Sequence, residues 1–232
     1  RSLSRFLVAK YSDYIVTLTK KDKEIWMNKT GRLENITAIA NPCTYGIRNN
    51  NPSLEARTVL AIGRLCKIKS FDLLIRAWSC SYKDLSGWKL IIVGEGEEKE
   101  NLLCLINKLN MEDTVEIHPF SDRVEEYYEK ASFLCLSSQF EGFPMVLLEC
   151  LSFSLPVVSF DCDLGPRELV FHNENGFLVE PNNIESMSHY IIKMANLPIA
   201  EYERMKLFAR SYALNFSLEN ITKQWIQIIE NL

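Results

Sequence analysis

The run EGFPMVLLE, residues 141–149, decides the fold of this chain. It follows FLCLSS at 133–138, a continuous apolar stretch that predicts a buried strand, and it opens an apolar helix at 143–153. Pro144 suits the first helical turn, because its missing N–H costs nothing there. Glu149 falls in the middle of the helix, where a carboxylate is poorly placed unless it has a partner. We therefore interpret Glu149 as a binding residue.

Short apolar runs alternate with amphipathic stretches on both sides of this run. Strands are predicted at 57–63, 89–94, 114–117, 133–138, 156–160 and 176–179. Helices are predicted between them, at 71–82, 97–109, 123–131 and 143–153. This alternation indicates βαβ units, and strands that are apolar throughout indicate a sheet covered on both faces. The predicted fold class is therefore α/β, a Rossmann-like parallel sheet with helices on both faces.

The pattern divides the chain into three parts. Residues 1–41 repeat the alternation in miniature but are too few to bury a full core of their own. Small strands are predicted there at 14–18 and 36–40. We interpret this part as the remnant of a preceding domain, ending where Asn41-Pro42 breaks the pattern, and we expect the chain to be the C-terminal portion of a longer one. Residues 42–216 would form the Rossmann-like domain and 217–232 a C-terminal helix.

Composition narrows the class of protein. The net charge of −4 argues against nonspecific nucleic-acid binding, which needs a basic surface. Seven cysteines without a CxxC pair indicate reduced thiols in a cytosolic protein. No apolar run approaches the ~20 residues that span a bilayer. None of the three histidines has metal-ligand spacing to a partner, so we predict no metal site held by the protein.

Polar residues follow the ends of several predicted strands, where an open parallel sheet forms its ligand site. Arg64 and Lys69 follow the strand at 57–63, and two cations there can neutralise a diphosphate. The alternative is a solvated helix start with chance basic residues. His118 follows the strand at 114–117 and could face the cleft or pack on the surface of the sheet.

Glycines and a helix start complete the candidate site. Gly94 and Gly96 permit a tight turn and close approach of a ligand, although a plain turn is an equal alternative. Gly142 allows backbone close to a ligand, and the N–H groups of Phe143, Met145 and Val146 could point at sugar hydroxyls or phosphate oxygens. The turn at 161–168 should lie beside this helix start, and the alternative for it is an ordinary capped turn.

Together these residues resemble a known family. The segments that carry the resemblance are GRLCKIKSFDLLIRAW, IIVGEGEEKENL, SSQFEGFPMVLLECLSFSLPVVSFDC and GPRELVFHNENGFLVEPNN. Their order and spacing over residues 57–182 resemble the C-terminal, nucleotide-sugar-binding domain of the GT-B glycosyltransferases, specifically glycosyltransferase family 4. The most specific feature is the pair Glu141 and Glu149 with Arg64 and Lys69 upstream.

The resemblance implies a role for each residue. Arg64 and Lys69 would hold the donor diphosphate and stabilise the leaving group, Glu141 would face the donor sugar, and Glu149 would bind the ribose hydroxyls. The implied catalytic set is Arg64, Lys69 and Glu141. The implied donor-binding set is Gly63, Gly94, Gly96, His118, Glu141, Gly142, Phe143, Pro144, Met145, Val146 and Glu149. Family members usually carry Gly at the position of Ser70, so the entrance to the following helix is expected to differ.

The resemblance also implies an activity and a setting. The enzyme would move a hexose or N-acetylhexosamine from a nucleotide-diphosphate sugar, expected to be a UDP-sugar, with retention of configuration and without metal or cofactor. The acceptor would be a saccharide, free or lipid-linked, in O-antigen or capsule synthesis on the cytoplasmic side. A lipid-linked acceptor would bring peripheral membrane contact through the N-terminal part, and basic residues near 1–32 hint at it.

Two other readings stay open. The chain could bind a nucleotide sugar without transferring it, if an acceptor domain is missing. It could also be a UDP-sugar 2-epimerase on the same fold, which would need acid/base carboxylates and a histidine around the sugar ring, and only His118 can be nominated. In GT-B folds the last helix packs back on the N-terminal domain, so the apolar stripe of 217–232 would then be partly exposed.

Overall fold

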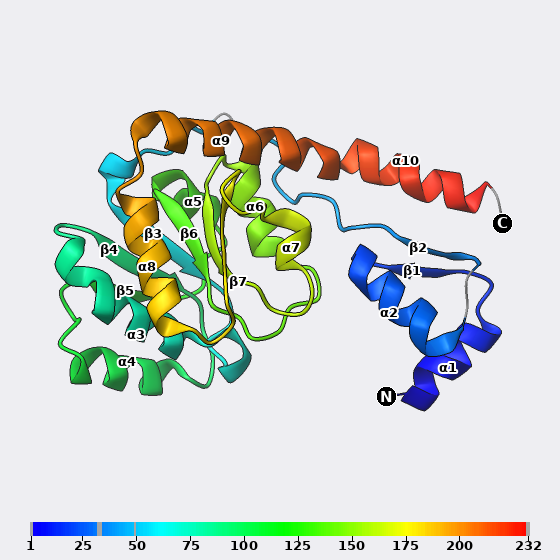
Figure 1. The fold of residues 1–232 in the computed structure, drawn as a ribbon, viewed down its shortest axis with the longest axis horizontal. Coiled ribbons are helices and arrows are strands. Elements are labelled where there is room, and N and C mark those ends of the chain that lie inside the picture. The colour runs from blue at the N-terminus through cyan, green and yellow to red at the C-terminus, as the bar shows by residue number, and fades with distance from the viewer. Residues whose placement is uncertain (1, 32–33, 49, 231–232) are drawn as a thin grey trace.

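The computed structural model describes residues 2–31, 34–48 and 50–230. It shows two units joined by a long helical segment (Figure 1). The larger unit contains a six-stranded sheet and the smaller unit a two-stranded sheet, and every strand pair is parallel. The predicted α/β class is confirmed. Arg1, Arg32 and residues 231–232 lie outside the described residues.

The strand order of the large sheet is β5-β4-β3-β6-β7-β8. The strands are β3 (Thr58–Ile62), β4 (Lys89–Val93), β5 (Val115–His118), β6 (Phe133–Leu136), β7 (Val157–Phe160) and β8 (Gly176–Val179). The chain runs outward from β3 to β5 and then returns to the other side of β3, where β6 pairs with it. The helices that follow β3 and β6 therefore lie on opposite faces of the sheet, and such a switch point is where open α/β sheets bind ligands.

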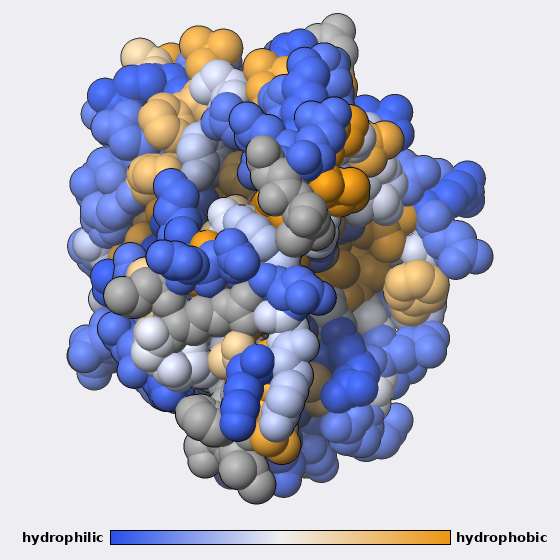
Figure 2. All heavy atoms as spheres, turned by 90° about the vertical axis from the view of Figure 1, so that its right-hand side faces the viewer, coloured by the Kyte–Doolittle hydropathy of each residue, from blue (hydrophilic) through white to orange (hydrophobic). Residues whose placement is uncertain are grey.

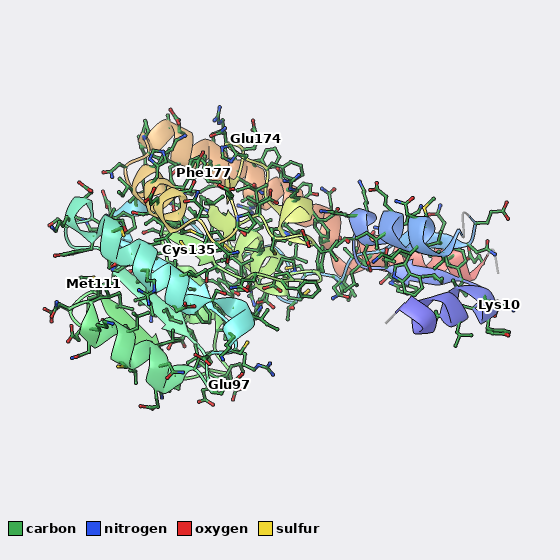
Figure 3. The ribbon with its side chains drawn as sticks, turned by 60° about the horizontal axis from the view of Figure 1, so that its bottom comes forward. Lys10, Glu97, Met111, Cys135, Glu174 and Phe177 are labelled. Carbon is green, nitrogen blue, oxygen red and sulfur yellow. The ribbon has the colours of Figure 1, made fainter. Side chains whose placement is uncertain are left out.

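Helices cover both faces of the large sheet (Figure 1). One face packs against α3 (Phe71–Ser81), α4 (Lys99–Lys108) and α8 (Ile184–Ala195). The other packs against α5 (Glu125–Lys130), α6 (Met145–Ser152) and α9 (Ile199–Ala213). Strand side chains alternate between the two cores, so both faces are apolar, as predicted from strands that are apolar throughout. Cys135 and Phe177 lie inside this unit (Figure 3).

The smaller unit is one βαβ unit preceded by a helix. Its elements are α1 (Ser2–Tyr11), β1 (Ile15–Thr17), α2 (Lys20–Thr30) and β2 (Ile36–Ala38). Thr19 caps α2, because its side-chain oxygen accepts from the N–H of Asp22 at 3.0 Å. Gly31 ends the helix in the left-handed region at φ 68°. The strands predicted at 14–18 and 36–40 are present but shorter.

A helical segment that is interrupted at Ser217, where the backbone is extended, links the two units. The turn η4 (Leu214–Phe216) joins α9 to α10 (Leu218–Ile229), and α10 leaves the large unit to lie beside β2 (Figure 1). A cavity of ≈ 340 Å³ separates α10 from the smaller unit, with Thr37 on one side and Ile228 on the other. On α10, Trp225 is 42% and Ile229 64% exposed. Figure 2 looks at this end of the molecule and shows apolar side chains exposed among polar ones.

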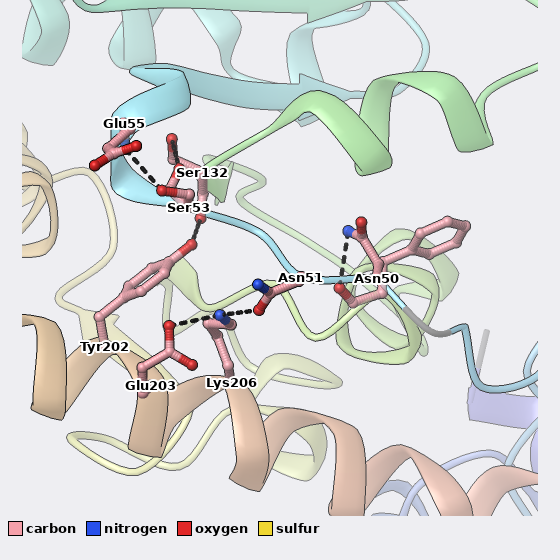
Figure 4. Close-up of polar contacts among 9 residues, drawn as sticks. Asn50, Asn51, Ser53, Glu55, Ser132, Tyr202, Glu203 and Lys206 are labelled. Carbon is pink, nitrogen blue, oxygen red and sulfur yellow. Dashed lines mark hydrogen bonds and ion pairs between the residues drawn. The ribbon is translucent and has the colours of Figure 1, made fainter.

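Polar contacts fasten the segment after residue 42 to the large unit (Figure 4). The buried Lys206 ammonium on α9 donates to Asn51 Oδ1 at 2.6 Å and to Glu203 Oε1 at 2.7 Å. Ser132 Oγ donates to the carbonyl of Ser53 at 2.8 Å. A buried cation needs such partners, so this connection is held in a defined place.

Short helical turns are the main departure from the predicted elements. They are η1 (Leu54–Ala56), η2 (Lys67–Lys69), η3 (Tyr82–Asp84) and the four-residue α7 (Pro166–Leu169). All seven cysteines are free. Among the described helices, none combines the length and the apolar character that crossing a membrane requires.

Candidate functional site

The loops after β3 and β6 meet at the switch point. Lys69 Nζ lies 2.7 Å from Glu141 Oε1, so two residues 72 positions apart in the sequence are brought into direct contact. Ser137 Oγ donates to the carbonyl of Lys69 at 2.8 Å, and the N–H of Gln139 donates to the carbonyl of Ile68 at 2.9 Å. The two loops are therefore held together by backbone as well as by charge.

The Lys69–Glu141 ion pair is partly shielded from water. The two side chains are 23% and 10% exposed, so each charge depends on the other more than it would at the surface. The lysine stem lies against Gly63, where a Cβ would make an ordinary contact with Lys69 Cε at 3.4 Å. The lysine ammonium has further N–H donors, which leaves it able to bind an anion while it stays paired.

Ser70 explains how the loop turns into α3. It lies in the left-handed region at φ 48°, where Gly is the favoured residue, and it both ends η2 and precedes α3. Its Oγ donates to the carbonyl of Lys67 at 3.0 Å. This hydrogen bond ties the Ser70 side chain back to η2, and a difference from the helix entrance of Gly-bearing relatives stays a prediction.

Arg64 lies on the same loop but points to solvent. Its side chain is exposed, and a hydrogen bond to the Cys66 thiol and the nearby Glu97 carboxylate raise the guanidinium pKa. Glu97 lies at the rim of the large unit (Figure 3). Arg64 thus shares the loop with Lys69 without being bound in the Lys69–Glu141 pair.

Gly94 and Gly96 lie where the loop after β4 packs against the loop after β3. A Cβ at Gly94 would lie 2.0 Å from the carbonyl oxygen of Gly63, and one at Gly96 would lie 2.3 Å from that of Leu65. Both glycines therefore let the loop after β4 pack on the loop after β3. Close approach of neighbouring backbone thus requires glycine at both positions, and contact of either glycine with a donor stays a prediction.

His118 ends β5 with both ring nitrogens engaged. Nε2 lies 2.9 Å from Glu116 Oε2 and Nδ1 3.1 Å from the hydroxyl of Tyr127. The ring lines a cavity of ≈ 410 Å³ between α5 and the sheet, together with Arg123 and Lys130. The alternative of a histidine packed on the sheet matches this placement, and a donor contact by His118 stays a prediction.

The start of α6 presents unpaired backbone donors. Within the described chain, the N–H groups of Gly142, Phe143, Met145 and Val146 have no acceptor, as expected for a first helical turn. The positive end of the helix dipole adds to their attraction for anions. Gly142 is exposed and a Cβ there would meet nothing within 4 Å, so the turn is open to a ligand.

The turn at 161–168 lies against this helix start, as predicted. Gly165 has φ 90°, and a Cβ there would lie 2.4 Å from Pro144 Cδ. The side chain of Phe143 turns away from the opening: it is buried, and its ring centroid lies 5.9 Å from that of Phe216 in η4. Only the backbone of Phe143 therefore remains available to a ligand.

Glu149 lies further along α6 with a partner on each carboxylate oxygen. The Tyr128 hydroxyl donates to Oε2 at 2.9 Å, and Thr44 Oγ1 donates to Oε1 at 3.1 Å. Burial raises the pKa of Glu149, while the two hydroxyl donors act in the opposite direction. An ionised carboxylate accepts more than one hydrogen bond per oxygen, so Glu149 retains capacity for ligand hydroxyls.

Thr44 and Tyr128 are the residues that the sequence did not single out. They lie 105 and 21 positions away from Glu149, and neither a motif nor a period links them to it. The sequence nonetheless indicates that such donors exist, because a glutamate inside an apolar helix needs hydrogen-bond donors from other elements.

A metal centre has no ready position in the described part of the chain. No group of at least three His, Cys, Asp or Glu side chains is close enough there to hold an ion. The described site offers cations, backbone N–H groups and carboxylates, a set suited to phosphates and sugar hydroxyls.

Comparison with known proteins places this chain in a family. The model of the family described as "Glycosyl transferases group 1" matches residues 47–212. An uncharacterized glycosyltransferase of Haemophilus influenzae is 41% identical over 99% of the chain. The amylovoran biosynthesis glycosyltransferase AmsD of Erwinia amylovora is 32% identical over 94% of it. The chain spans 64% and 62% of the lengths of these two relatives.

Solved structures share the fold. The chain superimposes on a mutant form of S. aureus TarM, crystallised in complex with Fondaparinux, alpha-GlcNAc-glycerol and UDP, with a TM-score of 0.87 at 26% identity. The match covers 96% of this chain and 45% of that one. The comparisons give no support to the epimerase alternative.

Proposed function

The chain belongs to the group 1 glycosyltransferase family, and on that premise we propose that it is the donor-binding half of a retaining family 4 enzyme of GT-B fold. It takes a hexose or N-acetylhexosamine from a nucleotide-diphosphate sugar, most simply a UDP-sugar. The acceptor is a saccharide or a lipid-linked saccharide in cell-surface polysaccharide synthesis, at the cytoplasmic side of the membrane. AmsD, which acts in amylovoran biosynthesis, supports this setting.

The observation that carries the proposal is the convergence at the switch point. Lys69 and Glu141 are in contact there, beside the free N–H groups at the start of α6. A diphosphate suits the lysine and the helix start, and the hydroxyls of a sugar suit a carboxylate and backbone donors. UDP bound to the S. aureus relative supports the choice of nucleotide.

Each residue then has a task in the transfer. Lys69, with Arg64 from the exposed rim, holds the diphosphate and stabilises the charge that develops on it. Glu141 and the turn at Gly142 orient the sugar, and Glu149 binds the ribose hydroxyls. The bond from the anomeric carbon to the phosphate oxygen breaks, and a bond to the acceptor oxygen forms on the same face. The acceptor proton goes to the leaving diphosphate.

The described chain supplies cationic side chains where other transferases use a divalent ion. Arg64 and Lys69 neutralise the leaving diphosphate, so the reaction proceeds without bound metal. Transfer assayed in excess EDTA is expected to equal transfer without it. A loss of activity restored by Mg²⁺ would contradict metal independence.

The second candidate function is nucleotide-sugar binding without transfer by the chain alone. It is favoured by the share of the relatives that this chain spans, 64% and 62%. In GT-B enzymes of this kind the acceptor is expected to need the remaining part. Binding and transfer are therefore tested separately.

Calorimetric titration with UDP-, GDP- and ADP-sugars tests the binding step. We expect saturable binding of one nucleotide class, and Glu149→Ala should weaken it by about 1.5–3 kcal/mol, the scale of hydrogen bonds to a charged group. Glu174→Ala, on the exposed loop before β8, is the matched control. An unchanged dissociation constant for Glu149→Ala would overturn the assignment of this site.

A further inference from the structure

The segment that connects the two units runs along the donor-binding helix. Cys43 Sγ donates to the carbonyl of Leu148 at 3.9 Å, and Thr44 donates to Glu149. Further along, the N–H of Arg48 donates to the carbonyl of Ser152 at 3.0 Å, and Asn50 Nδ2 donates to that of Phe153 at 3.2 Å. The connection from Cys43 to Asn50 thus follows the last turn of α6 and its C-cap residue Phe153.

The same segment is tied to the other crossing between the units. The N–H of Cys43 donates to the carbonyl of Phe216 in η4 at 2.8 Å. Adjacent residues of the connection, Cys43 and Thr44, are thus bonded to η4 and to Glu149 respectively. Thr44 is exposed, so its hydrogen bond to Glu149 is held only by the position of its backbone.

Tyr128 fixes Glu149 from the opposite side. It is fully buried on α5, and its ring stacks on Phe153 with centroids 5.1 Å apart and meets Tyr45 edge-on at 6.4 Å. The hydroxyl thus has a fixed position from which to donate to Oε2. The two donors arrive from different elements, which leaves the carboxylate few orientations.

We propose that Thr44 and Tyr128 are positioning residues that orient Glu149 and keep it ionised for the ribose hydroxyls, with Thr44 making this readiness depend on the connection between the units. The inference rests on the proposed function of Glu149 as the ribose-binding residue. On this proposal the connecting segment affects the orientation and charge of Glu149, in addition to joining the two units.

The charge state of Glu149 gives a specific readout. The titratable groups that face it are Tyr128 from α5, Tyr45 from the connection and Cys150 on its own helix, and burial raises the pKa of each. These three stay neutral in the acid range, so Glu149 is the group among them that titrates there. Arg48 is the nearby basic residue, with its guanidinium 6.0 Å from the ring centroids of Tyr45 and Phe153.

The direction of the effect follows from the two hydroxyl donors. Both favour the ionised carboxylate, so removing either raises the pKa of Glu149 further. Donor binding that needs the carboxylate is lost as pH falls through this pKa. The acid limb of binding therefore moves toward neutral pH in a variant that lacks one donor.

The experiment is a titration of the full chain with UDP from about pH 5 to about pH 8, using Thr44→Val and Tyr128→Phe. We expect each to weaken UDP binding roughly three- to tenfold and to shift the acid limb to higher pH. Titration of UDP itself is common to all variants and cancels in the comparison. Tyr45→Phe, which removes a neighbouring hydroxyl with no hydrogen-bond partner among the described residues, should match the native chain in both respects.

Glu149→Gln distinguishes the proposed role of Glu149 in binding from the positioning roles of Thr44 and Tyr128. If it neither weakens UDP binding nor removes the acid limb, the proposed function of this carboxylate fails. If it does both while Thr44→Val and Tyr128→Phe keep the native affinity and the native acid limb, the positioning inference is overturned. Thr44 is exposed, so Thr44→Val is expected to fold and decides the matter even if Tyr128→Phe does not.

Discussion

At the scale of single residues, the candidate site depends on one ion pair and one carboxylate. Lys69 and Glu141 neutralise each other in a partly buried position, and Glu149 is held by two hydroxyls. Opposite charges that are shielded from water attract each other strongly, and the loss of one partner leaves a partly buried charge without a counter-charge. These groups therefore hold the free site in shape before any ligand arrives.

Lys69→Met should test this balance. It keeps an apolar stem but leaves the Glu141 carboxylate, 10% exposed, without its cation. We expect a loss of about 1–3 kcal/mol in the free energy of unfolding and a larger loss in donor binding or turnover. Urea unfolding and UDP titration measure the two effects.

The double variant Lys69→Met/Glu141→Gln is the control. Since it removes both charges, it should recover most of the stability but none of the donor binding. If the double variant is as unstable as Lys69→Met, the ion pair is not what stabilises this junction.

At the scale of elements, the large sheet could be predicted well from the sequence. Strands that are apolar throughout and helices with an apolar face have strong periods, so each predicted strand of the large unit is present within about two residues. The short helical turns could not be predicted, because an element such as η2 spans only three residues and shows no hydrophobic period. Hydrogen bonds between residues far apart in the sequence could not be predicted either. Thr44 and Tyr128 contact Glu149 only once α5, α6 and the connection have packed together.

Gly94 and Gly96 show what the sequence can and cannot predict about a glycine. Positions 94 and 96 could be recognised as requiring glycine, but the neighbour that requires it is the backbone of Gly63 and Leu65. A sequence shows that backbone must come close at a position, and only the fold shows what comes close.

A matched pair of glycine substitutions separates packing from binding. Gly94→Ala would place a Cβ 2.0 Å from the Gly63 carbonyl oxygen, so we expect a loss of stability of about 1–3 kcal/mol or more. Gly142→Ala meets nothing within 4 Å and should leave stability within about 0.5 kcal/mol. If the turn touches the donor sugar, Gly142→Ala should nonetheless weaken UDP-sugar binding. Native affinity in Gly142→Ala would remove this turn from the site.

At the scale of the whole molecule, the candidate donor site lies next to the crossing between the two units. A cavity of ≈ 350 Å³ at this crossing is lined by Phe143 from the donor turn, Phe216 from η4 and Lys20 from α2. Glu168 on α7 spans the gap, because its Oε1 accepts from the N–H groups of Lys20 at 2.9 Å and Lys21 at 3.4 Å. The candidate site and the smaller unit therefore line one cavity, and α7 contacts α2 directly.

Glu168→Ala should loosen this contact. The carboxylate interacts with the positive end of α2, and such an interaction contributes about 0.3–1 kcal/mol. We expect faster hydrogen exchange of the Lys20 and Lys21 amides, with core amides of the large sheet unaffected. Glu180→Ala, far along the chain after β8, is the control. Equal exchange in the Glu168→Ala variant and the native chain would show that the contact does not hold α2.

We propose above that a nucleotide diphosphate binds at the switch point between β3 and β6. Backbone amide NMR during a UDP titration tests it most directly. We predict that the largest shift changes fall on residues 63–70 and on Gly142, Phe143, Met145 and Val146. Changes confined to the cavity beside His118, Arg123 and Tyr127, or no saturable change at all, would contradict the account.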